Sequence, residues 1–213
     1  DTVCLLESFQ FFDQSIVTSG AITGWSWDFG DGNTSILQDP VHEYANAGVY
    51  NVTLDVTTSS GCTNTGTYTV TVFDPPSNSF DFTIPCEGQP TIFTDLSTDN
   101  NGTVEYWEWD FGDGSPLENI QNPQHLYVTP GTYPVTLIVA SSNGCYDTLI
   151  QNVTIYPSPT ADFISGLECG GVPVDLVSTS TGNIVNYEWI FDGNTISTIE
   201  NPTYTFPTDT DTH

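Results

Sequence analysis

Hydrophobic and polar residues alternate with a period of two along much of this chain. Tyr50-Asn-Val-Thr-Leu-Asp-Val56 and Tyr133-Pro-Val-Thr-Leu-Ile-Val139 show the pattern over seven positions, and Tyr68-Thr-Val-Thr-Val72 and Val153-Thr-Ile155 show it in shorter runs. Successive side chains of a strand point to opposite faces, so the alternation predicts β-strands with one buried face. Gly, Asn, Asp, Ser and Pro separate the runs, as is typical of turns. We therefore predict an all-β fold.

One segment of the chain is repeated. Trp25-Ser-Trp-Asp-Phe-Gly-Asp-Gly32 returns as Trp107-Glu-Trp-Asp-Phe-Gly-Asp-Gly114, and a shorter form returns as Glu188-Trp-Ile-Phe-Asp-Gly193. Trp27 and Trp109 are 82 positions apart. A fixed long period indicates modules in series, each with its own core, and short strands in such numbers favour a β-sandwich of about seven strands per module.

Pro-rich stretches after Phe73 and Tyr156 mark the boundaries between modules and predict semi-rigid joints. We assign module 1 to residues 1–73, module 2 to 79–156 and module 3 to 160–213. Phe80-Asp-Phe82 and Ala161-Asp-Phe163 open modules 2 and 3, so module 1 is expected to lack its first strand. Module 3 is expected to lack its last strands, and only module 2 to be complete.

Aromatic residues recur at fixed places in each copy. A Trp stands two positions before a Phe, so both side chains share one strand face. We predict that these pairs form the cores: Trp27 and Phe29, Trp109 and Phe111, Trp189 and Phe191. Trp25 and Trp107 lie one step further out on that face, where contact with a sugar is the alternative to packing.

The Gly-Asp-Gly steps predict hairpin turns, because Gly supplies positive φ and Asp bonds its own backbone. Calcium binding is the alternative, through Asp28 and Asp31 in module 1 and Asp110 and Asp113 in module 2. Carboxylate oxygens suit Ca²⁺, but a site needs about six to eight of them. The run also lacks the spacing of an EF-hand loop. Calcium is the one cofactor that the sequence suggests.

The five cysteines follow the same period: Cys4 and Cys86 are 82 positions apart, and Cys62 and Cys145 are 83 apart. The simplest pairing lies within modules, as Cys4–Cys62 and Cys86–Cys145. By the chain-entropy relation, each such loop would contribute roughly 4 kcal/mol. The partner of Cys169 is expected near position 228, beyond the end of this chain. Disulfides indicate an oxidising, extracellular compartment.

Charge excludes several kinds of partner. The chain has no Lys or Arg and a formal net charge of −27. Nucleic-acid binding depends on basic side chains, as does attraction to anionic lipid. The sequence holds no apolar run long enough to span a bilayer. We therefore predict neither nucleic acid as a partner nor direct membrane insertion, and self-repulsion favours an extended, soluble array.

The sequence contains little that would indicate catalysis. His42 and His125 share one register, but Tyr204 takes that place in module 3. We interpret both histidines as residues that pack in a strand or form a hydrogen bond with the backbone. The chain has no Gly-x-Ser-x-Gly and no set of nucleophile and base, so we predict that it is not an enzyme.

Three runs together resemble the polycystic kidney disease (PKD) repeat. They are Trp27-Asp-Phe-Gly-Asp-Gly32, Asp39-Pro-Val-His-Glu-Tyr44 and Ala47-Gly-Val-Tyr-Asn-Val-Thr-Leu54 in module 1, with counterparts at 109–114, 122–127 and 130–137 in module 2. The version with cysteines is similar to repeats in large cell-surface adhesins of gliding bacteria with type IX secretion. The resemblance implies immunoglobulin-like sandwiches, extracellular placement, and spacing or adhesion without catalysis.

These observations predict a segment of a secreted cell-surface adhesin or extracellular filament, built as a rod-like, disulfide-stapled acidic array. Its partners would be neighbouring modules of a longer chain, with surface glycans or other cell-surface proteins as ligands. An accessory PKD region of a secreted hydrolase and a glycan-binding module are the alternatives.

Overall fold

The computed structural model describes residues 2–84, 86–166 and 170–207. These residues form strands, turns and loops, and no helix among them could cross a bilayer. The all-β prediction is thus confirmed. The chain divides into two compact units, of which the first holds module 1 and most of module 2. The second unit holds module 3 and short segments of module 2.

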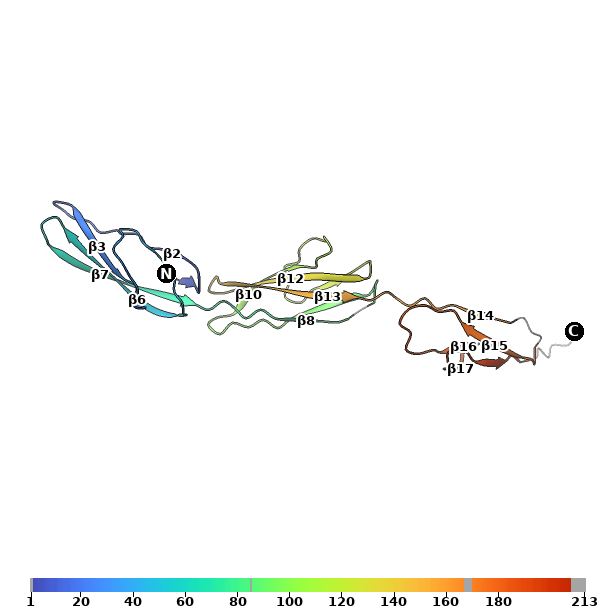
Figure 1. Cartoon of the computed structure of the whole chain (residues 1–213). Helices are drawn as coiled ribbons and strands as arrows, with labels where there is room; N and C mark the ends of the chain where they lie inside the picture. The colour runs from blue at the N-terminus through green and yellow to red at the C-terminus, as the bar shows by residue number, and fades with distance from the viewer. Residues whose placement is uncertain (1, 85, 167–169, 208–213) are drawn as a thin grey trace. The chain divides into compact units, whose positions relative to one another are not determined.

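Module 1 is built around a long hairpin (Figure 1). Its strands are β1 (Thr2–Cys4), β2 (Phe9–Gln10), β3 (Ile22–Asp28), β4 (Thr34–Ser35), β5 (Val41–His42), β6 (Gly48–Thr58) and β7 (Thr63–Phe73). Five of them form a sheet in the order β1-β7-β6-β3-β4, and β2 pairs with β5 in a second, short sheet. β1 runs parallel to the end of β7, with Cys4 opposite Phe73.

Module 2 repeats this plan. Its strands are β8 (Phe80–Phe82), β9 (Pro90–Asp95), β10 (Val104–Asp110), β11 (Gln124–Leu126), β12 (Gly131–Ser141) and β13 (Tyr146–Ile155). One sheet has the order β10-β12-β13 and the other has the order β11-β9-β8. Trp109 of β10 pairs with Leu137 of β12, as Trp27 of β3 pairs with Leu54 of β6.

Module 3 has shorter strands. They are β14 (Phe163–Ser165), β15 (Pro173–Ser178), β16 (Trp189–Phe191), β17 (Asn194–Ser197) and β18 (Thr203–Thr205). They form a sheet in the order β14-β15-β18 and a two-stranded hairpin of β16 and β17. The described part of module 3 holds no counterpart of the long β12–β13 hairpin.

The apolar faces of the strands meet in the module cores. In module 1 the core consists of Val3, Phe11, Trp27, Phe29, Tyr44, Val52, Val70 and Val72. In module 2, Trp109, Leu137 and Val139 are completely buried, as the alternation of their strands requires. In module 3, Val174 and Leu176 are the buried apolar residues within the described range.

Candidate functional site

The repeated turn after β3 is closed by its own carboxylates. Asp28 Oδ1 accepts a hydrogen bond from the Gly30 backbone N–H at 2.9 Å, and Asp31 Oδ1 accepts one from the Asn33 N–H at 3.0 Å. In module 2, Asp110 and Asp113 accept bonds from the Gly112 and Ser115 N–H groups at 2.9 and 3.0 Å. These aspartates are thus turn-forming residues, in the way that Asp commonly bonds its own backbone.

In modules 1 and 2, a histidine contacts both the turn and the core. His42 Nε2 lies 2.8 Å from Asp31 Oδ2, and the imidazole stacks on the Phe29 ring with centroids 4.0 Å apart. His125 Nε2 lies 2.8 Å from Asp113 Oδ2, and its ring stacks on Phe111 at 4.1 Å. Packing or a backbone hydrogen bond was predicted for both histidines; each ring packs on a phenylalanine, and each also contacts a carboxylate that was not predicted. The signal in the sequence was the Asp that precedes each His by 11 or 12 positions.

Hydrogen bonding favours the ionised form of Asp31 and Asp113. Partial burial raises the pKa of Asp31, but bonds from Asn33 and His42 outweigh this effect and leave the pKa below the ordinary value of 3.8. The pKa of Asp113 is lowered in the same way, with burial opposed by bonds from Ser115 and His125. Accepting several hydrogen bonds favours the charged form of a carboxylate, which explains why the pKa is lowered for both residues.

The described residues contain no group of three or more His, Cys, Asp or Glu side chains that could hold a metal ion. Both oxygens of Asp31 already accept bonds, Oδ1 from the Asn33 N–H and Oδ2 from the Asn33 amide and His42. Calcium binding through Asp28, Asp31, Asp110 or Asp113 stays a prediction.

The inner tryptophans pack as core residues in modules 1 and 2. Trp27 is 6% exposed and Trp109 is 0% exposed, and Phe29 and Phe111 are buried beside them. The Nε1 atoms of Trp27, Trp109 and Trp189 donate to the carbonyls of Leu37, Ile120 and Ile199 at 2.9–3.0 Å.

Module 3 differs from this core arrangement. Trp189 is half-buried and Phe191 is 39% exposed. Both line an open apolar cleft together with Phe163, Leu176 and Phe206. The predicted core pair of module 3 is therefore not enclosed, because no long hairpin covers it within the described residues.

The outer tryptophans are fixed by carboxylates. Trp25 Nε1 donates to Asp13 Oδ2 at 2.6 Å, and Trp107 Nε1 donates to Asp95 Oδ2 at 2.7 Å. Both rings are half-buried. The sequence reasoning missed these aspartates, although each stands 12 positions before its Trp. A sugar platform needs an accessible ring face, and this arrangement leaves only part of each indole exposed.

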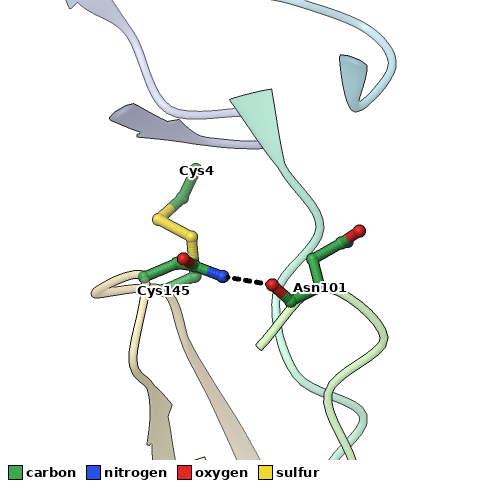
Figure 2. Close-up of a disulfide and its surroundings, with 4 residues drawn as sticks. Cys4, Asn101 and Cys145 are labelled. Carbon is green, nitrogen blue, oxygen red and sulfur yellow. Dashed lines mark hydrogen bonds between the residues drawn. A yellow bond between two sulfur atoms is a disulfide. The ribbon is translucent and has the colours of Figure 1, made fainter. Parts of the chain in front are cut away.

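A single disulfide joins modules 1 and 2 within the described residues. Cys4, at the end of β1, bonds to Cys145, in the turn between β12 and β13, with their Cα atoms 5.5 Å apart (Figure 2). That Cα distance is typical of disulfides. In the same turn, Asn143 Nδ2 donates to the Asn101 carbonyl at 3.1 Å.

This bond corrects the pairing predicted from the sequence, which was Cys4–Cys62 and Cys86–Cys145. Cys4 lies opposite Phe73 at one end of β7, whereas Cys62 directly precedes Thr63 at the other end. A strand of that length separates the two by roughly 30 Å, at about 3.3 Å per residue. A bond within module 1 is therefore geometrically excluded. Cys62 and Cys86 are exposed free thiols, and the prediction for Cys169 lies outside the described residues.

Comparison with known proteins agrees with this architecture. The family model described as PKD domain matches twice, at residues 1–72 and 74–155. A microbial collagenase of Vibrio alginolyticus is 45% identical over 60 residues, which cover 28% of this chain and 7% of that protein. The pre-pro-metalloprotease PrtV of Vibrio cholerae is 29% identical over 141 residues, 65% of this chain and 15% of its own length.

Human polycystin-1 is 31% identical over 142 residues, 63% of this chain and 3% of its own length. The chain thus spans only a small part of each of these relatives. Among solved structures, the PKD1 domain of the Vibrio cholerae metalloprotease PrtV matches with 30% identity and a TM-score of 0.35. That match covers 38% of this chain and 96% of the domain. The family model covers well over half of the residues of the present chain. This chain therefore belongs to the PKD domain family and carries two copies of the domain in tandem.

Proposed function

We propose that this chain is a non-catalytic spacer region of a secreted protein, in which disulfides between neighbouring PKD modules limit their relative motion. The observation that carries the proposal is the Cys4–Cys145 bond between modules 1 and 2. A covalent bond in addition to the peptide linker gives the two modules a second connection. The joint then loses conformational freedom that a single linker would leave.

Charge and compartment support this role. A net charge of −27 without any Lys or Arg makes modules repel one another, which favours an extended arrangement over a compact one. The disulfide fits an oxidising, extracellular compartment. In a cell-surface adhesin or filament, such a region would carry a binding element away from the cell, with surface glycans or other surface proteins as the ligands of that element.

Small-angle X-ray scattering of the 213-residue chain tests the spacer function. We expect the radius of gyration and the spread of conformations to increase when reductant is added, and equally in Cys4→Ser without reductant. Cys62→Ser is the matched control, since Cys62 is unbonded, and its profile should equal that of the wild type. If Cys4→Ser and the wild type scatter identically under oxidising conditions, the bond does not restrain the joint and the proposal is wrong.

The similarity to a collagenase favours a second candidate, an accessory region of a secreted hydrolase. Such a region would hold a catalytic domain near an insoluble substrate. Co-sedimentation of this chain with insoluble collagen and with polysaccharides tests it, and also tests direct glycan binding. Retention on collagen that competes with soluble collagen supports the accessory function, and no retention on any matrix leaves the spacer function as the sole assignment.

A further inference from the structure

Two described cysteines take no part in the disulfide. Cys62 and Cys86 are exposed and unbonded, in a chain whose other described cysteines are joined to each other. Each of the two stands one repeat away from a bonded cysteine: Cys86 is the counterpart of Cys4, and Cys62 is the counterpart of Cys145. Their local structures can therefore be compared with those of a pair that is known to bond.

The backbone around Cys86 reproduces the backbone around Cys4. Cys4 pairs in parallel with Phe73, whose carbonyl accepts from the next residue's N–H at 2.8 Å. Cys86 forms a parallel bridge to Tyr156, whose carbonyl accepts from the Glu87 N–H at 2.8 Å. The carbonyls of both cysteines accept from the N–H three positions later, at 3.1 Å in each case. Cys86 is thus held as the bonded Cys4 is held.

The turn that carries Cys62 likewise reproduces the turn that carries Cys145. The Cys62 carbonyl accepts from the Thr58 N–H at 2.9 Å, and the Cys145 carbonyl accepts from the Ser141 N–H at 2.8 Å. The glycine before each cysteine has φ of +83°, a conformation that favours Gly. Both cysteines therefore close the same kind of hairpin turn, directly before the strand that follows it.

We propose that Cys62 and Cys86 are halves of further disulfides to adjoining PKD modules, made by the rule that the Cys4–Cys145 bond shows. Cys62 would bond to the cysteine of a preceding module that is equivalent to Cys4, at the end of a first strand. Cys86 would bond to the cysteine of a following module that is equivalent to Cys145, in a hairpin turn. The proposal rests on the spacer function, and its partner is defined chemically as a thiol of a PKD module, supplied by a longer chain or by a second copy.

Each bond forms by oxidation of two thiols. The two sulfurs lose one proton and one electron each and join, and a small disulfide oxidant such as oxidised glutathione accepts the two electrons and is reduced to two thiols. The exposure of Cys62 and Cys86 leaves both sulfurs accessible for this exchange.

The experiment first assigns the thiols of the 213-residue chain. The chain has no Lys or Arg for trypsin, but cleavage before Asp places all five cysteines on separate peptides: 1–12, 55–73, 81–94, 113–146 and 162–174. After alkylation without reduction, mass spectrometry should find peptide 1–12 joined to 113–146, and Cys62 and Cys86 alkylated. If the joined peptide is missing, the proposed function fails before the further inference is tested.

The second step adds a module in register. Residues 1–82 are placed directly before Asp1, which keeps the 82-residue period, and the added copy carries Cys62→Ser so that one Cys62 remains. In a glutathione redox buffer we expect Cys62 to lose its alkylation and peptide 1–12 to appear joined to peptide 55–73, while 1–12 joined to 113–146 persists. Cys4→Ser in the added copy is the matched control and should restore alkylation of Cys62.

Non-reducing gels assign the source of the partner. A bond found in the monomer band comes from the same chain, and one found in the dimer band comes from a second copy. If Cys62 stays alkylated while the Cys4–Cys145 peptide is present, the proposal is overturned, because the native joint formed and the added joint did not bond. A second variant, with residues 128–156 placed after Phe206, tests Cys86 independently and should protect it from alkylation.

Discussion

At the scale of single residues, the histidines of modules 1 and 2 each make a polar contact and a packing contact. His42 and His125 each bond a turn carboxylate and stack on a core phenylalanine. In module 3, Tyr204 takes this place against Phe191, with ring centroids 5.9 Å apart and an angle of 47°. In module 3, a shorter turn therefore occurs together with a tyrosine in place of the histidine. This indicates that the contact of the histidine is specific to the longer Gly-Asp-Gly turn.

We predict that His125→Ala lowers the stability of module 2 by about 1–2 kcal/mol, since it removes both a stacking contact and a bond to a carboxylate. His125→Phe keeps a ring on Phe111 and should lose less. Urea denaturation, followed by tryptophan fluorescence, measures both. Equal losses for the two variants would mean that stacking contributes nothing.

The turn carboxylates predict how stability depends on pH. The pKa values of Asp31 and Asp113 are lowered in the folded chain, so the folded state holds these protons less tightly than the unfolded state. Their contribution is complete above the ordinary value of 3.8 and is lost as the pH falls further, through the folded pKa. In thermal melts, Asp113→Asn should be less stable than the wild type at pH 6, and the difference should shrink below pH of about 4. A constant difference across this range would contradict the assignment.

At the scale of elements, the Gly-Asp-Gly turn is set by contact as well as by backbone angle. Gly30 has φ of +80°, and a Cβ at this position would lie 2.7 Å from the Asn51 carbonyl oxygen of β6. Gly32 has φ of +93° but no atom within 4 Å of such a Cβ. In module 3 the turn is reduced to Asp192 and Gly193, both with positive φ, between paired residues Phe191 and Asn194. Two residues with positive φ are typical of the type I′ hairpin.

The two glycines give a matched pair of variants. Both alanine substitutions strain the backbone, but only Gly30→Ala also forces a side chain against β6. We expect Gly30→Ala to destabilise module 1 by about 2 kcal/mol more than Gly32→Ala. Chemical denaturation of the two variants measures the difference. If both lose the same amount, the approach of β6 does not constrain the turn.

Most elements could be predicted from the sequence because their causes are local. Alternation indicated the strands, Gly-Asp-Gly indicated the turns, and the spacing of Trp27 from Phe29 indicated their shared face. Partners brought together by the fold were harder to foresee. The carboxylates of Asp13 and Asp95 meet their tryptophans across the module, and among 27 acidic residues nothing local distinguishes these two.

At the scale of the whole molecule, the disulfide shows why periodicity alone could not give the pairing. The first cysteine of a module could bond to the second cysteine of its own module or to the second cysteine of the next module. In a chain with an 82-residue period, both pairings are compatible with the same cysteine positions. What decides is that the two cysteines of module 1 lie at opposite ends of β7. The register of β1 beside Phe73, which is a tertiary feature, had to be known first.

The chain carries 27 acidic side chains and no Lys or Arg. Salt normally weakens both attraction and repulsion between charges. Among the described residues, attraction is limited to the contacts of His42 with Asp31 and of His125 with Asp113, which are ionic only when the histidine is protonated, so repulsion dominates. We therefore expect the melting temperature to rise steadily by several degrees between low salt and about 0.5 M NaCl, as the screening length falls from tens of ångströms to a few. Differential scanning calorimetry measures this. A flat or falling trend would show that repulsion does not oppose folding.

The same titration tests calcium when ionic strength is held constant. Mg²⁺ screens charge as Ca²⁺ does but demands a stricter octahedral geometry, so a difference between the two ions reports a specific site. Equal melting temperatures in the two salts would rule out the calcium site predicted at the repeated turn, where Asp31 and Asp113 already bond backbone N–H groups and histidines. An excess in Ca²⁺ that disappears in Asp110→Asn would place calcium at the repeated turn. The carboxylates would then have to exchange their present donors for the ion, and the turn would be a binding element as well as a structural one.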